Sequence, residues 1–156
     1  EAHFRKAVEL QDHLVAESPD VPLARSRLAD TWFRWGNVLF AQERPAAAAE
    51  RYQRAIALRK TLLGERPDSA AWREDLARCL YNLGAAQARL RQLDQAETAL
   101  RESLWHYAEL MRTKSAAARH RPRFLDVAMR LGQLLKQRGV SAGESADLLA
   151  PAISSW

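Results

Sequence analysis

The chain has 156 residues, of which 47% are hydrophobic and 28% are charged, enough apolar material for one domain with a continuous core. It is rich in Ala, Arg, Leu and Glu and holds only 6 Gly and 6 Pro, a composition typical of helix throughout. No run approaches the roughly 20 apolar residues of a membrane span, so we expect no membrane partner. The net charge of +5 would suit nucleic acid. Because the excess is nearly all arginine, we favour ordinary solvated helix faces as its explanation.

The single cysteine and the first residue bear on the origin of the chain. Cys79 excludes an intrachain disulfide and fits a reducing compartment, so the expected location is cytoplasmic. It falls on a mostly apolar helical pattern, which favours a small buried hydrophobe over a nucleophile. The chain begins with Glu1 in the middle of a helical pattern, so we expect a piece of a longer protein.

Apolar residues recur at helical spacing along the whole chain and predict about seven helices, all α. The expected helices cover residues 4–17, 21–42, 46–63, 69–91, 94–113, 122–138 and 141–149. Pro122 is expected in the first turn of the sixth helix, and residues 116–119 as an extension of the fifth. Gly139 is expected to end the sixth helix as its C-terminal cap.

Three glycines interrupt these helical patterns at a constant spacing of 48 residues, namely Gly36, Gly84 and Gly132. Glycine inside a helix costs about 1 kcal/mol relative to alanine, so each should permit the close approach of another helix. Further identities recur at the same spacing without insertion: Ala7/Ala55, Leu10/Leu58, Leu14/Leu62, Glu17/Glu65, Pro19/Pro67, Asp20/Asp68, Arg25/Arg73, Leu28/Leu76, Ala29/Ala77 and Ala48/Ala96. A constant spacing of this kind indicates a repeated structural unit.

The repeat divides one domain, residues 1–156, into similar units. We expect residues 1–17 to be the second helix of a truncated repeat, followed by repeats at 21–66, 68–118 and 120–150, the last with a short closing helix. A helical hairpin cannot bury its apolar face alone, so neighbouring units should stack into a solenoid. Both open ends of such a stack would expose apolar surface.

The first two units each carry a large apolar residue, then an apolar-Gly pair, then a small alanine in the following helix, and the third unit matches only the first half of this pattern. The residues that carry this pattern are Trp32, Trp35-Gly36, Ala48, Tyr52 and Ala55, then Leu80, Leu83-Gly84, Ala96, Leu100 and Ser103, then Ala128 and Leu131-Gly132. The pattern resembles the tetratricopeptide repeat, whose usual length is about 34 residues. The longer unit is similar to arrays attached to bacterial serine/threonine kinases and signalling ATPases. The resemblance implies a right-handed superhelical solenoid of antiparallel helix pairs.

Catalytic patterns are lacking in the sequence. We find no glycine-rich phosphate loop, no nucleophile elbow and no histidine pair at metal-ligand spacing, and therefore expect no enzyme, cofactor or metal site. His13 shares a helix face with Glu9 and Glu17, where a metal is conceivable. Solvated His–Glu pairs are the favoured interpretation of that face.

The resemblance implies a concave groove, lined by the first helix of each unit, that holds a peptide. The groove residues would be Phe33, Asn37, Phe40, Tyr81, Asn82, Arg89, Met129, Arg130 and Gln133. Aromatic residues and arginine are the types enriched at binding hot spots.

Some of these positions match a more specific ligand site. Asn37, Asn82 and Arg130 fall where chaperone-adaptor members clamp a terminal carboxylate. Phe33 and Asp126 replace the lysines of that clamp, and the aspartate would repel a carboxylate, so we disfavour this specific interpretation.

The expected function is a non-enzymatic protein- or peptide-binding scaffold, or a regulatory module, within a larger bacterial signalling protein. Two alternatives stay open. One is a basic helical repeat that associates with nucleic acid, for which the cluster Arg119-His120-Arg121-Pro122-Arg123 is the best candidate, although it lacks aromatic residues for stacking. The other is self-association through the open ends of the solenoid.

Overall fold

The computed structural model describes residues 1–18, 20–112 and 114–140, and this part of the chain holds six α-helices and no strand. The helices are α1 (Ala2–Glu17), α2 (Pro22–Ala41), α3 (Pro45–Glu65), α4 (Ala70–Arg89), α5 (Leu93–Leu110) and α6 (Lys114–Gln137). The prediction of an all-α fold is confirmed. The expected closing helix at residues 141–149 lies outside the described residues.

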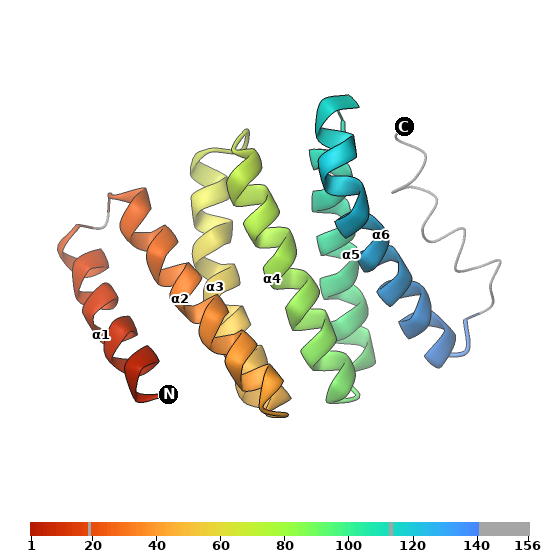
Figure 1. The fold of residues 1–156 in the computed structure, drawn as a ribbon, viewed down its shortest axis with the longest axis horizontal. Helices are drawn as coiled ribbons and strands as arrows, with labels where there is room; N and C mark the ends of the chain where they lie inside the picture. The colour runs from red at the N-terminus through yellow and green to blue at the C-terminus, as the bar shows by residue number, and fades with distance from the viewer. Residues whose placement is uncertain (19, 113, 141–156) are drawn as a thin grey trace.

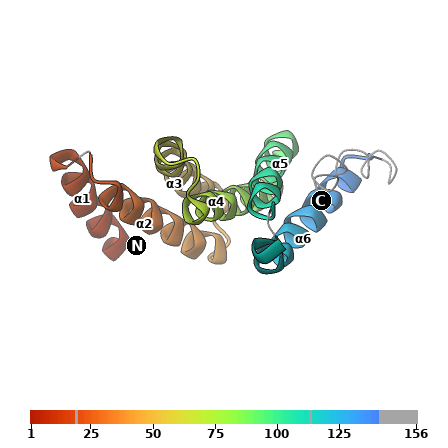
Figure 2. The same ribbon diagram turned by 90° about the horizontal axis from the view of Figure 1, so that it is seen from above.

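The helices stack in chain order, each packed on the next, and consecutive helices run antiparallel (Figure 1). α1 and α6 lie at opposite ends of the row, while α2, α4 and α6 form one layer and α3 and α5 the other (Figure 2). This arrangement is a helical-repeat solenoid, as predicted. No helix in the described part of the chain is both long and apolar enough to cross a membrane.

The turns after α2, α4 and α6 share one backbone conformation. Glu43, Arg91 and Gly139 lie 48 residues apart and have φ angles of 58°, 61° and 79°. In each turn the next N–H reaches back to a helix carbonyl at 3.0 Å, in the pairs Arg44–Leu39, Gln92–Gln87 and Val140–Leu135. This six-residue hydrogen bond around a left-handed residue is the Schellman motif, which ends helices. The prediction of Gly139 as a cap is confirmed.

Two of the three spaced glycines mark close helix contacts. A Cβ on Gly36 would lie 2.6 Å from the Tyr52 ring, and one on Gly84 would lie 2.8 Å from Cγ of Leu100. Around Gly132, the described residues place no atom within 4 Å of an added Cβ, so a third close approach stays a prediction. In the first two units the contact comes from the helix that follows, and the helix expected after α6 begins at Ser141, outside the described residues.

The position of Pro122 differs from the prediction. α6 begins at Lys114, so Pro122 lies inside the helix and residues 116–119 belong to α6 rather than extending α5. Proline inside a helix removes a hydrogen bond and costs about 3 kcal/mol. Buried His120 and Phe124 lie on either side of Pro122. Their packing holds the backbone helical through the proline, which local rules alone do not foresee.

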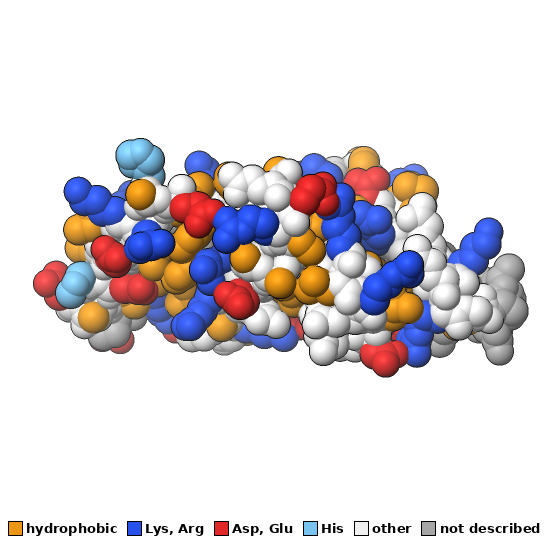
Figure 3. All heavy atoms as spheres, turned by 90° about the horizontal axis from the view of Figure 1, so that it is seen from below, with side chains coloured by type: hydrophobic (Ala, Val, Ile, Leu, Met, Phe, Trp, Pro, Cys, Tyr) orange, Lys and Arg blue, Asp and Glu red, His pale blue; other side chains and the backbone are white. Residues whose placement is uncertain are grey.

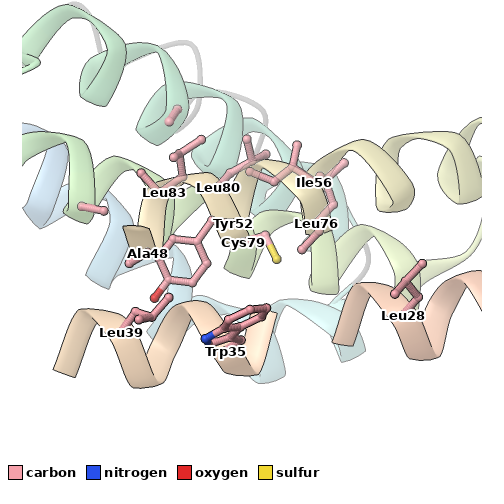
Figure 4. Close-up of a cluster of buried hydrophobic side chains, with 14 of the residues drawn as sticks. Leu28, Trp35, Leu39, Ala48, Tyr52, Ile56, Leu76, Cys79, Leu80 and Leu83 are labelled. Atoms are coloured by element: carbon pink, nitrogen blue, oxygen red, sulfur yellow. The ribbon is translucent and has the colours of Figure 1, made fainter. Parts of the chain in front are cut away.

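The core has two parts, one between α2, α3 and α4 and one between α4, α5 and α6. Figure 4 shows the first, where Trp35, Tyr52 and Cys79 from three different helices converge. Burial raises the pKa of the Cys79 thiol to about 12, so the group stays neutral in the core. The prediction that Cys79 is a small buried hydrophobe is confirmed.

The outer face of α1 is uncovered. Leu14, Leu62 and Leu110 occupy the same register in α1, α3 and α5, yet their exposed fractions are 55%, 1% and 7%. α3 and α5 each pack between two helices, whereas the main packing partner of α1 in the described structure is α2. The expected apolar surface at an open end of the solenoid is therefore present at α1.

Candidate functional site

A pocket of about 300 Å³ lies where side chains of α2, α4, α5 and α6 meet. We name it the central pocket and define it by its lining residues: Phe33, Arg78, Tyr81, Asn82, Tyr107, Arg123, Asp126 and Val127. Its lining includes the aromatic rings of Phe33, Tyr81 and Tyr107 and the guanidinium groups of Arg78 and Arg123. Such a mixture can hold an apolar side chain and a polar group at once.

Five of the nine predicted groove residues line hollows of the structure. Phe33, Tyr81 and Asn82 line the central pocket, and Asn37, Phe40 and Asn82 line a smaller hollow of about 160 Å³. The smaller hollow is completed by Ala41, Tyr52 and Ala85. Because Asn82 belongs to both, the two hollows adjoin along α4.

A short hydrogen-bond network fixes the boundary between the hollows. Asn37 Oδ1 accepts from the Tyr52 hydroxyl at 2.9 Å and from Asn82 Nδ2 at 2.8 Å. Burial raises the pKa of Tyr52 well above its usual value, so the hydroxyl keeps its proton. These two hydrogen bonds orient the side chains of Tyr52 and Asn82, and they use the acceptor capacity of Asn37 Oδ1 inside the fold.

Arg89 contacts Phe40, one of the residues that line the smaller hollow. Its guanidinium lies 4.6 Å from the centre of the Phe40 ring, a cation–π contact, and it forms an ion pair with Glu43 of the preceding turn. Exposed ion pairs of this kind contribute little stability. Their effect here is to hold the arginine over the aromatic ring.

The three groove residues predicted on α6 line neither of these hollows. Met129 is 62% exposed, and the central pocket takes Arg123, Asp126 and Val127 from the preceding turns of α6 instead. Repeat register predicts which face of a helix is inward but not where along its length a neighbour crosses. Arg130 and Gln133 follow Met129 in lying away from the lining.

The disfavoured carboxylate clamp does not assemble in the structure. Asn37 and Asn82 hydrogen-bond to each other, and Arg130 lines neither hollow.

Tyr107 and Arg123 are among the lining residues that the predicted groove did not include. Tyr107 comes from α5, a second helix of its unit, and the family pattern directs attention to first helices only. Arg123 belongs to the basic cluster that the sequence places at the start of a helix, and in the structure this cluster lies within α6. Arg123 lies three residues before Asp126 on the same helix, and residues at this spacing share a helix face. This spacing was the signal in the sequence that Arg123 lies on the same face as Asp126.

The basic cluster does not present one positive surface. Arg119 pairs with Glu74 at 3.4 Å, and Arg123 pairs with Asp126 at 3.5 Å. His120 is buried, with Nδ1 at 3.9 Å from the Glu74 carboxylate. On the face drawn in Figure 3, basic, acidic and hydrophobic side chains are interspersed, and no field of one sign forms.

No group of three or more His, Cys, Asp or Glu side chains among the described residues is placed to hold a metal ion. The strongly shifted groups are buried ones: burial lowers the pKa of His106 to about 4, with Arg73 acting in the same direction. The shift follows from core packing.

Residues 29–62 match the family model of the tetratricopeptide repeat. The matched segment begins in α2 and ends in α3, so it covers one helix pair and has the length of one ordinary unit of about 34 residues. A search of the curated proteins found no match. The chain is thus a helical-repeat solenoid in which the α2–α3 pair is similar to a tetratricopeptide repeat.

Proposed function

We propose that this chain is a non-enzymatic scaffold that binds a peptide segment of a partner protein along the layer formed by α2, α4 and α6. The central pocket carries the proposal, because side chains from four helices converge there around one hollow. The likeness of residues 29–62 to the tetratricopeptide repeat supports it, since such repeats generally act as protein-interaction modules.

The two adjoining hollows suit a peptide that inserts successive side chains. Their volumes of about 300 and 160 Å³ are of the size that takes single side chains, and they share Asn82 as a common wall. Aromatic walls provide contact area with little loss of side-chain entropy. A peptide crossing α4 would contact Tyr81 first and Phe40 next.

The wider context of the scaffold follows from the repeat. The 48-residue spacing and the resemblance to arrays of bacterial signalling proteins lead us to infer a regulatory module in a cytoplasmic signalling protein. In that context the units are residues 21–66, 68–118 and 120–150, preceded by the half-repeat 1–17. Supporting this division, the Schellman turns at Glu43, Arg91 and Gly139 recur at the same spacing.

A peptide-display selection tests the proposal with a matched pair of variants. Peptides selected on the wild-type protein should lose at least about tenfold in affinity for Tyr81→Ser, whose ring lines the central pocket. The control is Trp105→Ser, which removes a 53% exposed ring from α5 that lines none of the described hollows. Equal losses with both variants, or a loss with Trp105→Ser alone, would contradict binding in the groove.

The uncovered face of α1 favours a second function, self-association of the chain through its end. Leu10 and Leu14 of α1 are both more than half exposed, as is Leu23 at the start of α2. Sedimentation equilibrium should then show a dimer whose formation is insensitive to salt, because the contact is apolar. Leu14→Glu should abolish this dimer. A monomer at all concentrations would exclude this second function.

A further inference from the structure

A buried arginine joins the first two units of the solenoid. Arg59 of α3 is 3% exposed, and its guanidinium donates to Asp30 Oδ1 of α2 at 2.5 Å and to the backbone carbonyl of Asp75 in α4. The Asp75 carboxylate lies 3.8 Å away. One cation between two acids fills this junction, which satisfies the rule that a buried charge needs partners.

The next junction holds the opposite set of residues at the same register. Moving 48 residues along the chain replaces Asp30, Arg59 and Asp75 by Arg78, Tyr107 and Arg123. Two cations now flank a neutral phenol where two acids flanked a cation. All three of these residues line the central pocket, so the second junction has a hollow beside the residue that replaces Arg59.

A donor group at this pocket lacks an acceptor, and a second donor lies beside it. The second is the hydroxyl of Tyr107, a residue that is 1% exposed and lines the pocket. Burial raises its pKa to about 12, and Glu74 acts in the same direction while Arg123 and Arg78 oppose it, so the hydroxyl carries a proton to donate. Nε of Arg78 is buried without an acceptor in the described structure. Buried donors are normally satisfied, and this one is not.

We propose that the central pocket binds an oxyanion carried by the peptide, the carboxylate of an acidic side chain or a phosphoryl group, between Arg78 and Arg123 with a hydrogen bond from Tyr107. This inference rests on the proposed peptide-binding function and assigns the chemistry of one anchor. The residues differ from those of the carboxylate clamp considered from the sequence.

Two acids of the protein compete for the same arginines. Asp126 Oδ2 lies 3.5 Å from Arg123 Nη1, and Asp75 Oδ1 lies 3.4 Å from Arg78 Nη2. Charge-assisted hydrogen bonds are normally 2.7–2.9 Å long, so both contacts are loose. They orient the guanidinium groups, and an oxyanion in the pocket can make the shorter bonds.

Three short peptides serve as probes: acetyl-Tyr-Ala-Glu-Ala-Tyr-amide, the same peptide with Gln in place of Glu, and the same with phosphoserine. Each is titrated into the ¹⁵N-labelled protein while the side-chain Nε–H signals of Arg78 and Arg123 and the backbone amide of Tyr81 are followed. The Glu or the phosphoserine peptide should bind at least about tenfold more tightly than the Gln peptide and shift both arginine signals. The tighter of the two identifies the source of the oxyanion.

Variants separate an anchor from a merely structural role. Arg123→Gln should weaken the acidic peptide about tenfold, whereas Asp126→Asn should strengthen it severalfold by removing the competing carboxylate. Arg119→Gln removes an exposed charge of the same helix outside this lining and is the matched control, expected to match the wild type within about twofold.

The outcomes distinguish the two proposals. Equal binding of the Glu, Gln and phosphoserine peptides, with Tyr81 still shifted, would overturn the oxyanion site and leave the groove standing. Absence of any shift at Tyr81 with all three peptides would overturn the oxyanion site and count against the groove as well. If Arg119→Gln weakened binding of the acidic peptide as much as Arg123→Gln does, the effect would come from the net charge of the protein, and the assigned site would be overturned.

Discussion

Replacing Gly84 by alanine adds one methyl group at the tightest contact between α4 and α5. The new Cβ would lie 2.8 Å from Cγ of Leu100 and 3.2 Å from the carbonyl oxygen of Ala96. Leu100 is fully buried, and the carbonyl belongs to the backbone of α5, so neither can move away cheaply. The two helices must separate or shift.

The magnitude follows from two opposing contributions. Overpacking a core costs about 1–3 kcal/mol, and a contact involving backbone belongs at the upper end of that range. Alanine in place of glycine returns about 1 kcal/mol of helix propensity. We therefore expect a net loss of about 2 kcal/mol in the free energy of unfolding, which lowers Tm by about 4–8 °C in a domain of this size.

Thermal and urea unfolding followed by circular dichroism measure this change. The matched control is Gly64→Ala, also inside a helix, where nothing lies within 4 Å of the added Cβ and the full propensity gain of about 1 kcal/mol should appear as a higher Tm. Opposite signs for the two variants are expected. A Gly84→Ala protein as stable as the wild type would refute the close-packing argument.

Three further predictions concern stability. The pKa of His106 falls from 6.5 in the unfolded chain to about 4 in the fold, so the free energy of unfolding should decrease as the pH is lowered between those values, by at most about 3 kcal/mol. His106→Leu should flatten this pH profile, measured by urea unfolding. Arg91→Gly should raise the free energy of unfolding by about 0.5–1 kcal/mol, because the φ of 61° at this position favours glycine. Gly139→Ala should lower it by about 1 kcal/mol for the same reason. Changes of equal size and the same sign in the two variants would contradict this prediction. Leu62→Ala should cost about 2–5 kcal/mol in the same assay, whereas Leu14→Ala, its exposed equivalent in α1, should cost less than about 0.5 kcal/mol.

Helix positions could be predicted well because the residues that begin and end helices agree with the apolar periodicity along most of the chain. Pro22 and Pro45 begin helices, and Gly139 ends one, each for a local backbone reason. Pro122 was misplaced because the packing of α6 overrides its local preference. The contact expected at Gly132 depends on a neighbouring helix, which no local rule supplies.

The candidate site could be predicted only in part, for a geometric reason. Phe33, Tyr81 and Asn82 follow from repeat register, because α2 and α4 cross at equivalent points along their lengths. Met129 follows the same register but lies beyond the crossing with α6, which is set by the packed core. Tyr107 could be recognised only after α5 was seen to contribute to the pocket wall.

The comparison of junctions depends on sequence and structure together. Register alone pairs Arg59 with Tyr107, and the structure alone gives a pocket beside two arginines. Only the first junction, with its arginine held between Asp30 and Asp75, shows what occupies that place elsewhere in the same fold. Because the second junction has two arginines where the first has two aspartates, the ligand of the second junction is expected to be negatively charged.

The central claim is that a peptide binds along α2, α4 and α6, and the most direct test is to map where a display-selected peptide contacts the ¹⁵N-labelled protein by NMR. The account predicts that amide shifts concentrate at Phe33, Tyr81 and Val127 around the central pocket, with α1 unchanged. Shifts confined to Leu10 and Leu14 on the outer face of α1 would contradict it and make the end of the solenoid the binding surface.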